Sequence, residues 1–330
     1  MGARLGQEFL SLSQIGFKLM MNASNLVTSD RELVVPPTGA SVQNLPSITW
    51  PVMSVDRYAA FEQALGTRLL RTGDIWWVQI RPFFYRPLLP FERYDVEAVK
   101  KLVGHRGVFQ HAVMEGQAHN SYLNPIIFDD LHKYDPRQLR KNVRGSLKKG
   151  MASGATVRPI VDAAEFCEKA YPVYLSFYER TRYAFDKSRR SKEVFIRWAR
   201  RLFQFSDAVI LGAFAGQELI SFEIHCLVER TLILKSIVNS ESAVRTGAPD
   251  LVLHHVRSSA SGQSTIDKIY DTMRARNQGI NEYKVFRGAK VLALPSLLHI
   301  HPALLWSLRK VSRGIYSRLC GVHGDASPHP

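Results

Sequence analysis

The clearest pattern of hydrophobic and polar positions lies between Asp207 and Ser261. Three runs rich in Val, Ile, Leu and Phe are separated by two-residue breaks, at Gly216-Gln217 and at Glu229-Arg230. Runs joined in this way predict an antiparallel meander of three β-strands. The middle run alternates, so its strand has two distinct faces: Ile220, Phe222, Ile224, Cys226 and Val228 on one, and Ser221, Glu223 and His225 on the other.

A polar segment follows the meander and leads into a helical pattern. The segment is NSESAVRTGAP (239–249), and the helical run after it is DLVLHHVRSSA (250–260). We expect a glycine-containing loop that brings the chain to the N-terminus of a helix. Free backbone N–H groups at such an N-terminus can hold an anion.

A second clear signal is a basic helix over 136–153. Asp135 is placed to cap it and Pro136 to occupy its first position. Its apolar residues recur every fourth position and predict a buried stripe: Leu139, Val143, Leu147 and Met151. Its cations form a ladder at the same spacing: Arg140, Arg144 and Lys148. This ladder suits a nucleotide, a tRNA acceptor stem or the pyrophosphate of a lipid-linked sugar, and a solvated helix face has the same pattern.

The remaining pattern divides the chain into four segments. We expect a flexible arm over 1–45, a first domain over 46–135, a second domain over 136–301, and an amphipathic helix with a tail over 302–330. In the last helix one side is apolar (Leu304, Leu308, Val311, Ile315 and Leu319) and the other basic (Arg309, Lys310, Arg313 and Arg318). Such a helix either packs its apolar stripe on the domain or rests on an anionic membrane.

Composition narrows the class of protein. The chain of 330 residues is 45% hydrophobic and 22% charged, which is typical of a folded globular protein. A formal net charge of +15 indicates anionic partners. The three cysteines are widely spaced, and the histidine pairs lack a further ligand nearby, so we expect reduced thiols and no metal site. We find no apolar run long enough to span a bilayer, and the N-terminal residues make a poor signal peptide, so we expect a cytoplasmic location.

The run YKVFRGAK, from Tyr283 to Lys290, carries a resemblance to a known family. Together with the basic helix and the order of helix, meander, helix and strand, it is similar to the Fem-type branch of the GNAT superfamily. The resemblance implies an α/β (α+β) fold of tandem acyl-CoA N-acyltransferase domains, the first degenerate, with mostly antiparallel sheets flanked by helices. The segment 282–294 is expected to be a pair of strands.

The same resemblance implies an activity. The branch includes aminoacyl-tRNA-dependent transferases that build peptidoglycan cross-bridges, and acetyltransferase-like proteins of polysaccharide and lipid-linked glycan synthesis. We therefore expect an N-acyltransferase that uses acyl-CoA or aminoacyl-tRNA as cosubstrate, with no tightly bound cofactor, and an amine of a cell-envelope glycan as acceptor. It would work in the cytoplasm or at the inner membrane face. The alternative is a non-catalytic module of the same fold that binds tRNA or anionic lipid.

Candidate residues for the donor follow from this layout: Ile237, Val238, Arg245, Gly247, Ala248 and Lys284. The loop departs from the usual pyrophosphate loop, because Arg245-Thr246-Gly247-Ala248 is one residue short before the glycine. This departure weakens the case for CoA pyrophosphate at that loop.

Transfer to an amine needs a base, an oxyanion contact and an acid for the leaving group. Glu223 is the candidate base, and a solvated strand face is the competing interpretation of its position. Tyr270 and Tyr283 are candidate acids, because a phenol suits a departing thiolate. A structural role suits buried tyrosines equally. For the acceptor we expect the ladder of Arg140, Arg144 and Lys148 to act together with Tyr178 and Arg182, although the aromatic spacing there also fits a buried helix stripe.

Overall fold

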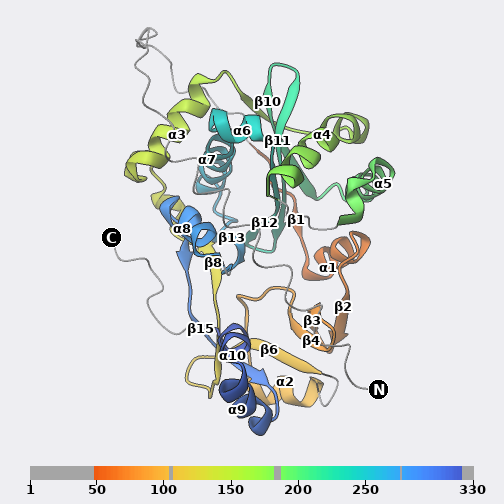
Figure 1. The fold of residues 1–330 in the computed structure, drawn as a ribbon, viewed down its shortest axis with the longest axis vertical. Helices are drawn as coiled ribbons and strands as arrows, with labels where there is room; N and C mark the ends of the chain where they lie inside the picture. The colour runs from red at the N-terminus through yellow and green to blue at the C-terminus, as the bar shows by residue number, and fades with distance from the viewer. Residues whose placement is uncertain (1–47, 104–106, 182–186, 276, 322–330) are drawn as a thin grey trace.

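A computed structural model of the protein describes residues 48–103, 107–181, 187–275 and 277–321. Two β-sheets lie one above the other along the long axis, and helices flank both (Figure 1). Mostly antiparallel sheets with flanking helices confirm the predicted fold class. The predicted arm (1–45) and residues 322–330 of the predicted tail lie outside the described residues.

The larger sheet contains the predicted meander. Its strand order is β14-β8-β13-β12-β11-β10-β9, and β1 pairs with the end of β11. The strands are β1 (Val52–Met53), β8 (Pro125–Phe128), β9 (Thr156–Pro159), β10 (Ala208–Ala215), β11 (Glu218–Val228), β12 (Thr231–Asn239), β13 (Lys268–Met273) and β14 (Lys290–Val291). The pairs β10–β11 and β11–β12 are antiparallel, which confirms the meander.

The smaller sheet has the order β2-β3-β4-β6-β15-β7, and β5 pairs with β6. Its strands are β2 (Leu69–Thr72), β3 (Ile75–Arg81), β4 (Phe84–Pro87), β5 (Arg93–Tyr94), β6 (Val108–Val113), β7 (Ser121–Leu123) and β15 (Leu294–His299). Helix α2 (Val96–Val103) packs on this sheet, where Val99 and Val103 join Trp77 and Phe109 in a small core.

Helices cover both faces of the larger sheet. On one face α1 (Val55–Ala64), α4 (Ala163–Thr181) and α5 (Lys192–Leu202) share an apolar core with Phe222 and Ile224 of β11. On the other face α7 (Ala248–Ser261) shares a second core with Leu211 of β10 and Leu234 of β12, and α3 (Lys141–Ala152) packs on α7. Short α6 (Glu241–Thr246) links β12 to α7, and α8 (Gln278–Phe286) follows β13.

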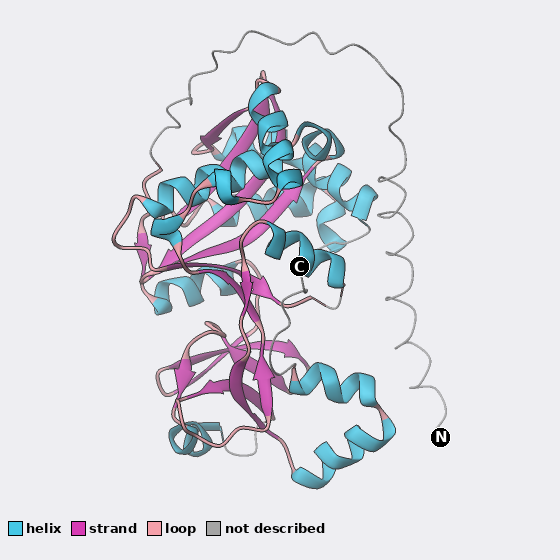
Figure 2. Ribbon diagram, turned by 90° about the vertical axis from the view of Figure 1, so that its left-hand side faces the viewer, coloured by secondary structure: helices cyan, strands magenta, loops and turns pink. Residues whose placement is uncertain are grey.

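The remaining helices of the residues described are a pair at the C-terminal end and three 3₁₀ turns. Helices α9 (Pro302–Val311) and α10 (Arg313–Cys320) project from the smaller sheet (Figure 2). The 3₁₀ turns are η2 (Leu131–Lys133), η3 (Pro136–Gln138) and η4 (Lys187–Arg190).

Each half of the chain contributes a strand to the sheet formed mainly by the other half. Strand β8 precedes residue 135, yet it pairs with β13 and β14 in the larger sheet. Strand β15 comes from the second half, yet it lies between β6 and β7 in the smaller sheet. The predicted domains, 46–135 and 136–301, stay a prediction. The two sheets exchange strands across residue 135.

Two segments have a different secondary structure from the one predicted. Residues 278–286 form helix α8 and not a strand, because the Asn277 side chain caps the helix by accepting the N–H of Gly279. The polar segment after the meander contains helix α6, because Ser240 caps it by accepting the N–H of Ala243.

Two predicted helices are interrupted. The basic helix begins as the 3₁₀ turn η3 and continues as α3 only from Lys141, and Met151 of its predicted buried stripe is exposed. The C-terminal helix breaks at Ser312, whose φ of −145° and ψ of 79° are not helical. This break leaves Val311 and Ile315 exposed and not on a buried stripe.

Candidate active site

Strands β12 and β13 separate within the larger sheet. They pair in parallel over Thr231–Lys268, Leu232–Ile269 and Ile233–Tyr270, and then β12 runs on to Asn239 while β13 pairs with β8. Both strands carry a β-bulge at this point, with Lys235 and Asp271 as the extra residues. Bulges bend a strand and redirect its side chains, often beside functional sites. We call this opening between β12 and β13 the split.

Four polar side chains gather beside the split, and we call them the split cluster: Glu223, Asp271, Tyr283 and Lys284. The Lys284 ammonium lies 2.6 Å from Asp271 Oδ1, and both side chains are largely buried. Tyr283 is the neighbour of Lys284 on α8. Burial first, and then the carboxylates of Asp250, Glu223 and Asp271, raise the pKa of Tyr283 to about 12, although the residue as a whole is 45% exposed. A phenol in this setting keeps its proton at neutral pH.

Glu223 lies beneath helix α7, so the solvated strand face considered above is wrong. Its residue is 1% exposed, and its neighbours Ser221 and His225 are also buried. Burial, followed by the nearby charge of Asp271, raises the pKa of Glu223 to about 8. Burial lowers the pKa of His225 to about 3. Both groups are therefore uncharged at neutral pH, with Glu223 Oε2 3.4 Å from His225 Nε2.

Tyr270 points to the other face of the sheet. It packs against Phe91, with ring centroids 5.1 Å apart, in the core that contains α1 and α4. Because successive side chains of a strand point to opposite faces, Asp271 reaches the split cluster and Tyr270 does not. The structure thus separates Tyr270 from Glu223 and Tyr283.

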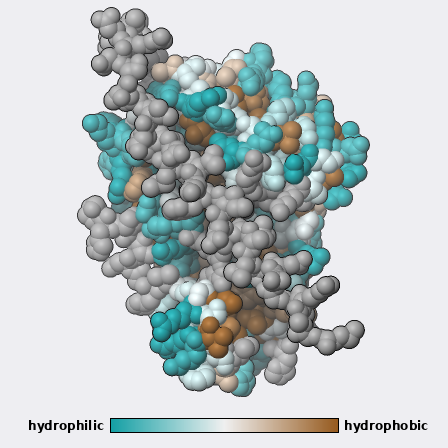
Figure 3. Space-filling model, viewed as in Figure 1, coloured by the Kyte–Doolittle hydropathy of each residue, from teal (hydrophilic) through white to brown (hydrophobic). Residues whose placement is uncertain are grey.

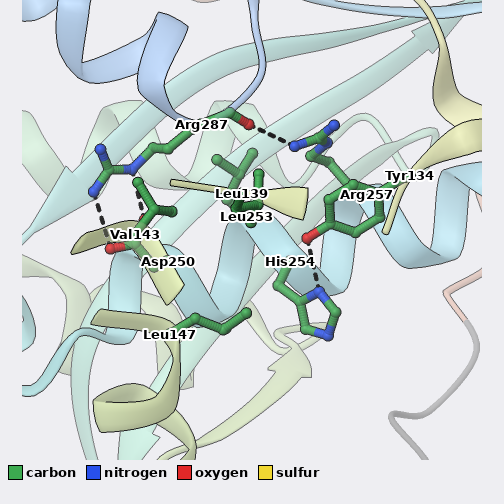
Figure 4. A pocket seen from close by; sticks show the side chains of 9 residues that line it. All are labelled: Tyr134, Leu139, Val143, Leu147, Asp250, Leu253, His254, Arg257 and Arg287. Carbon is green, nitrogen blue, oxygen red and sulfur yellow. Dashed lines mark hydrogen bonds and ion pairs between the residues drawn. The ribbon is translucent and has the colours of Figure 1, made fainter. Parts of the chain in front are cut away.

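The N-terminus of α7 is filled by the protein itself (Figure 4). Asp250, in the first turn, accepts hydrogen bonds from Ser146 Oγ on α3 at 2.5 Å and from Arg287 Nε after α8 at 2.6 Å. A negative charge in the first turn, held by Ser146 and Arg287, disfavours an external anion at this N-terminus. The cavity left between α3, α7 and Arg287 is about 10 Å³, which is room for about one water molecule.

The predicted donor residues around this N-terminus lie close to α3 or within the sheet. Gly247 has φ of +79°, and a Cβ there would lie within 3.0 Å of the Gly150 backbone nitrogen. Ala248 is fully buried, and Arg245 forms an exposed ion pair with Glu241 at 3.2 Å. Ile237 and Val238 belong to the part of β12 beyond its pairing with β13. Ile237 and Val238 are thus the predicted donor residues, besides Lys284, that lie along the split.

The cations of α3 have different surroundings. The Arg140 guanidinium stacks 4.0 Å from the Phe286 ring centroid, which connects α3 to α8. Arg144 Nη1 donates to the carbonyl of Leu139 at 2.6 Å, and Lys148 is exposed. Among the predicted acceptor residues, Tyr178 carries the Arg190 guanidinium 4.8 Å above its ring, and Arg182 lies outside the described residues.

The structure adds two residues that sequence reasoning missed. Asp271 follows Tyr270 directly, and its position on the opposite strand face was the available signal. Arg180 of α4 donates from Nη2 to the carbonyl of Asn239 at the end of β12, at 3.2 Å. Its Nε is buried and has no hydrogen-bond partner among the described residues. No sequence signal distinguished Arg180 from the other cations of the chain.

Two further observations bear on the kind of site. Within the described part of the chain, no three His, Cys, Asp or Glu side chains gather in an arrangement that would hold a metal ion. None of the helices in those same residues combines the length and apolar composition that a bilayer span requires.

Comparison with solved structures shows a shared fold. The chain is similar to FemX, with a TM-score of 0.53 and 10% identity over 76% of this chain and 92% of that one. It is similar to the C-terminal domain (DUF2156) of a putative lysylphosphatidylglycerol synthetase from Agrobacterium fabrum. The TM-score is 0.50 and the identity 11%, over 81% of this chain and 94% of that one. It is also similar to L-PGS from Bacillus licheniformis, with a TM-score of 0.50 and 12% identity over 82% of this chain and 98% of that one.

No protein-family model matches the sequence, and no curated protein matches it. At 10–12% identity the structural similarity concerns the fold alone. The chain has the tandem GNAT-like fold that the sequence resemblance implied.

Proposed function

We propose that the protein is an N-acyltransferase that works at the split. It moves an acyl or aminoacyl group to an amine of a cell-envelope polysaccharide or peptidoglycan-type intermediate. The observation that carries the proposal is the edge of β12 from Leu234 to Asn239, which leaves β13 beside the buried Asp271–Lys284 pair. An open strand edge offers backbone N–H groups to an oxyanion, and the split cluster offers groups that hold and donate protons.

The chemistry requires two proton transfers. The acceptor nitrogen forms a bond to the acyl carbon and gives up a proton, while the C–O bond of a tRNA ester or the C–S bond of a thioester breaks and its leaving atom takes a proton. We assign the base to Asp271 and to the ionised fraction of Glu223, which grows as the pH approaches its pKa of about 8. Tyr283 supplies the proton to the leaving atom, and Lys284 positions Asp271.

The donor is acyl-CoA or aminoacyl-tRNA, and the surroundings of α7 favour the tRNA. The negative charge of Asp250 and the packing of α3 against Gly247 disfavour a pyrophosphate at the N-terminus of α7, so a CoA donor would need another site for its phosphates. The exposed cations of α3, such as Lys148, suit the phosphates of a tRNA acceptor stem. The name lysylphosphatidylglycerol synthetase, borne by a protein of this fold, also describes a product with an aminoacyl group.

The test is mass spectrometry of the acylated product. The full chain is incubated with envelope extract and either a pool of aminoacyl-tRNA or a set of acyl-CoAs. We expect a product from the tRNA pool. In Asp271→Asn the loss of a general base should slow formation of that product by about 10²- to 10⁴-fold. Lys284→Gln should slow it as well. The matched control is Lys290→Gln, in the same sequence run but paired with Asp129 and Asp130 away from the split.

The alternative is a non-catalytic module that binds tRNA or anionic lipid. The enclosure of Glu223, which is 1% exposed, favours it, because a base normally contacts its substrate. Thermal unfolding distinguishes the two, since a ligand stabilises the state it binds. If no donor gives a product and uncharged tRNA stabilises the protein, the N-acyltransferase proposal is wrong and the protein is a non-catalytic tRNA-binding module.

A further inference from the structure

Helices α9 and α10 form a helical hairpin that is fixed at its two ends. The His301 side chain caps α9 by accepting the N–H of Ala303 at 3.3 Å. At the other end, Gln110 Nε2 of β6 donates to the carbonyl of Leu319 at 2.8 Å, and Cys320 is buried. The junction between α9 and α10 lies at the far end of the hairpin, away from the smaller sheet (Figure 2).

Exposed apolar side chains lie on both helices of the hairpin. Trp306 is 63% exposed, Val311 is 87% exposed and Ile315 is 40% exposed. Figure 3 shows hydrophobic surface over these helices with hydrophilic surface beside it. Apolar side chains grouped in this way mark a surface that a partner covers.

Basic residues accompany the apolar ones. Arg309, Lys310 and Arg313 are all exposed, and Lys310 Nζ lies 5.8 Å from the centre of the Trp306 ring. The sequence has no Asp or Glu from Tyr283 to Gly324. The partner must therefore offer both negative charge and an apolar layer.

We propose that the hairpin docks on an anionic lipid bilayer. Trp306, Val311 and Ile315 enter the boundary between headgroups and acyl chains, where an indole ring is favoured. Arg309, Lys310 and Arg313 contact the lipid phosphates. A second copy of the chain is a poor occupant, because it would bring a second set of cations against the first. This inference does not depend on the reaction at the split.

The experiment is vesicle flotation of the full chain, with neutral phosphatidylcholine vesicles compared with vesicles containing 30% phosphatidylglycerol. We expect binding to the anionic vesicles and a blue shift of Trp fluorescence that Trp306→Ala abolishes. Reversing the charges in Arg309→Glu, Lys310→Glu and Arg313→Glu should lower the apparent affinity by at least about 100-fold, because each lost cation contributed about 1 kcal/mol, 1.4 kcal/mol is tenfold, and each new carboxylate is repelled by the lipid phosphates.

The matched control places the same change on another exposed basic face. Arg197→Glu, Arg200→Glu and Arg201→Glu on α5 alter the net charge equally and leave the hairpin intact. If both triple variants lost the same affinity for anionic vesicles, the binding would depend only on net charge, and the proposal would be wrong. Binding to neutral vesicles as strong as to anionic ones, or concentration-dependent dimers that Trp306→Ala disperses without any vesicle binding, would overturn it as well.

Discussion

Glu223 and His225 show how the interior handles ionisable side chains at the scale of single residues. They are neighbours on one face of β11, 3.4 Å apart, and α7 covers them. An ion pair would require a charged carboxylate and a charged imidazole in a buried setting, where desolvation is costly. The raised pKa of Glu223 and the lowered pKa of His225 mean that both remain neutral instead. The protein therefore stores a proton on Glu223 beside the split.

This stored proton predicts a pH-dependent gain in stability for Glu223→Gln. The unfolded chain loses the proton near pH 4.5 and the folded chain near 8, so the folded state becomes progressively less favoured as the pH rises between these values. A neutral amide removes this loss. We expect little change in Tm at pH 4.5. By pH 8 the free energy of unfolding should be higher by a few kcal/mol, at about 1.4 kcal/mol for each pKa unit.

Thermal melts from pH 4.5 to 8.5 measure the effect. Glu218→Gln, an exposed position at the start of the same strand, is the control and should leave Tm unchanged at every pH. A gain of equal size at pH 5 and pH 8 would show that the substitution acts through packing and that Glu223 has an ordinary pKa.

At the scale of elements, local patterns predicted what local physics controls. The meander was predicted because each strand is an apolar run and each break is a two-residue turn. Helix α8 was missed because Tyr283, Val285 and Phe286 favour a strand, while the capping residue that starts the helix, Asn277, lies further upstream. The capping residue was present in the sequence, but the prediction followed the family resemblance and assigned strands.

The candidate site was predicted less completely than the fold. Glu223, Tyr283 and Lys284 were predicted and lie together, although Tyr283 and Lys284 were expected on a strand. Strand alternation alone placed Asp271 opposite Tyr270, but its approach to Lys284 also depends on a bulge in β13, which arises from pairing with β8 far away in the sequence. The filled N-terminus of α7 was also hidden, because Ser146 and Arg287 reach Asp250 only after three helices pack.

The contact between α3 and α7 predicts opposite effects for two glycines of one helix. A Cβ at Gly150 would lie 2.8 Å from the carbonyl oxygen of Gly247, whereas a Cβ at Gly145 would meet nothing within 4 Å. Alanine is favoured over glycine inside a helix by about 1 kcal/mol. We therefore expect Gly145→Ala to raise Tm and Gly150→Ala to lower it, because α3 must move away from α7.

Denaturant unfolding of both variants checks this pair, since each carries the same chemical change at a different site. If Gly150→Ala were as stabilising as Gly145→Ala, helices α3 and α7 would not be in backbone contact. The cover over the α7 N-terminus would then be open to a phosphate, and CoA would return as the favoured donor.

At the scale of the whole molecule, the exchange of strands makes the two sheets interdependent. Strand β8 lies between β13 and β14, and β15 lies between β6 and β7. Loss of either strand removes a partner on each side of it. This arrangement predicts that the sheets unfold together, although they form distinct layers along the molecule (Figure 1).

Two truncated chains test this interdependence. A chain ending at His301 keeps β15 and lacks the helical hairpin, and we expect it to unfold in one calorimetric transition with a Tm close to that of the full chain. A chain ending at Ala293 also lacks β15, so β7 loses the partner that holds it in the sheet and β6 gains an open edge. We expect its unfolding enthalpy to fall and its smaller sheet to be cut by protease under native conditions. If the chain ending at Ala293 had the same unfolding enthalpy as the chain ending at His301, β15 would not stabilise the smaller sheet. The predicted dependence of that sheet on a strand from the second half of the chain would then be wrong.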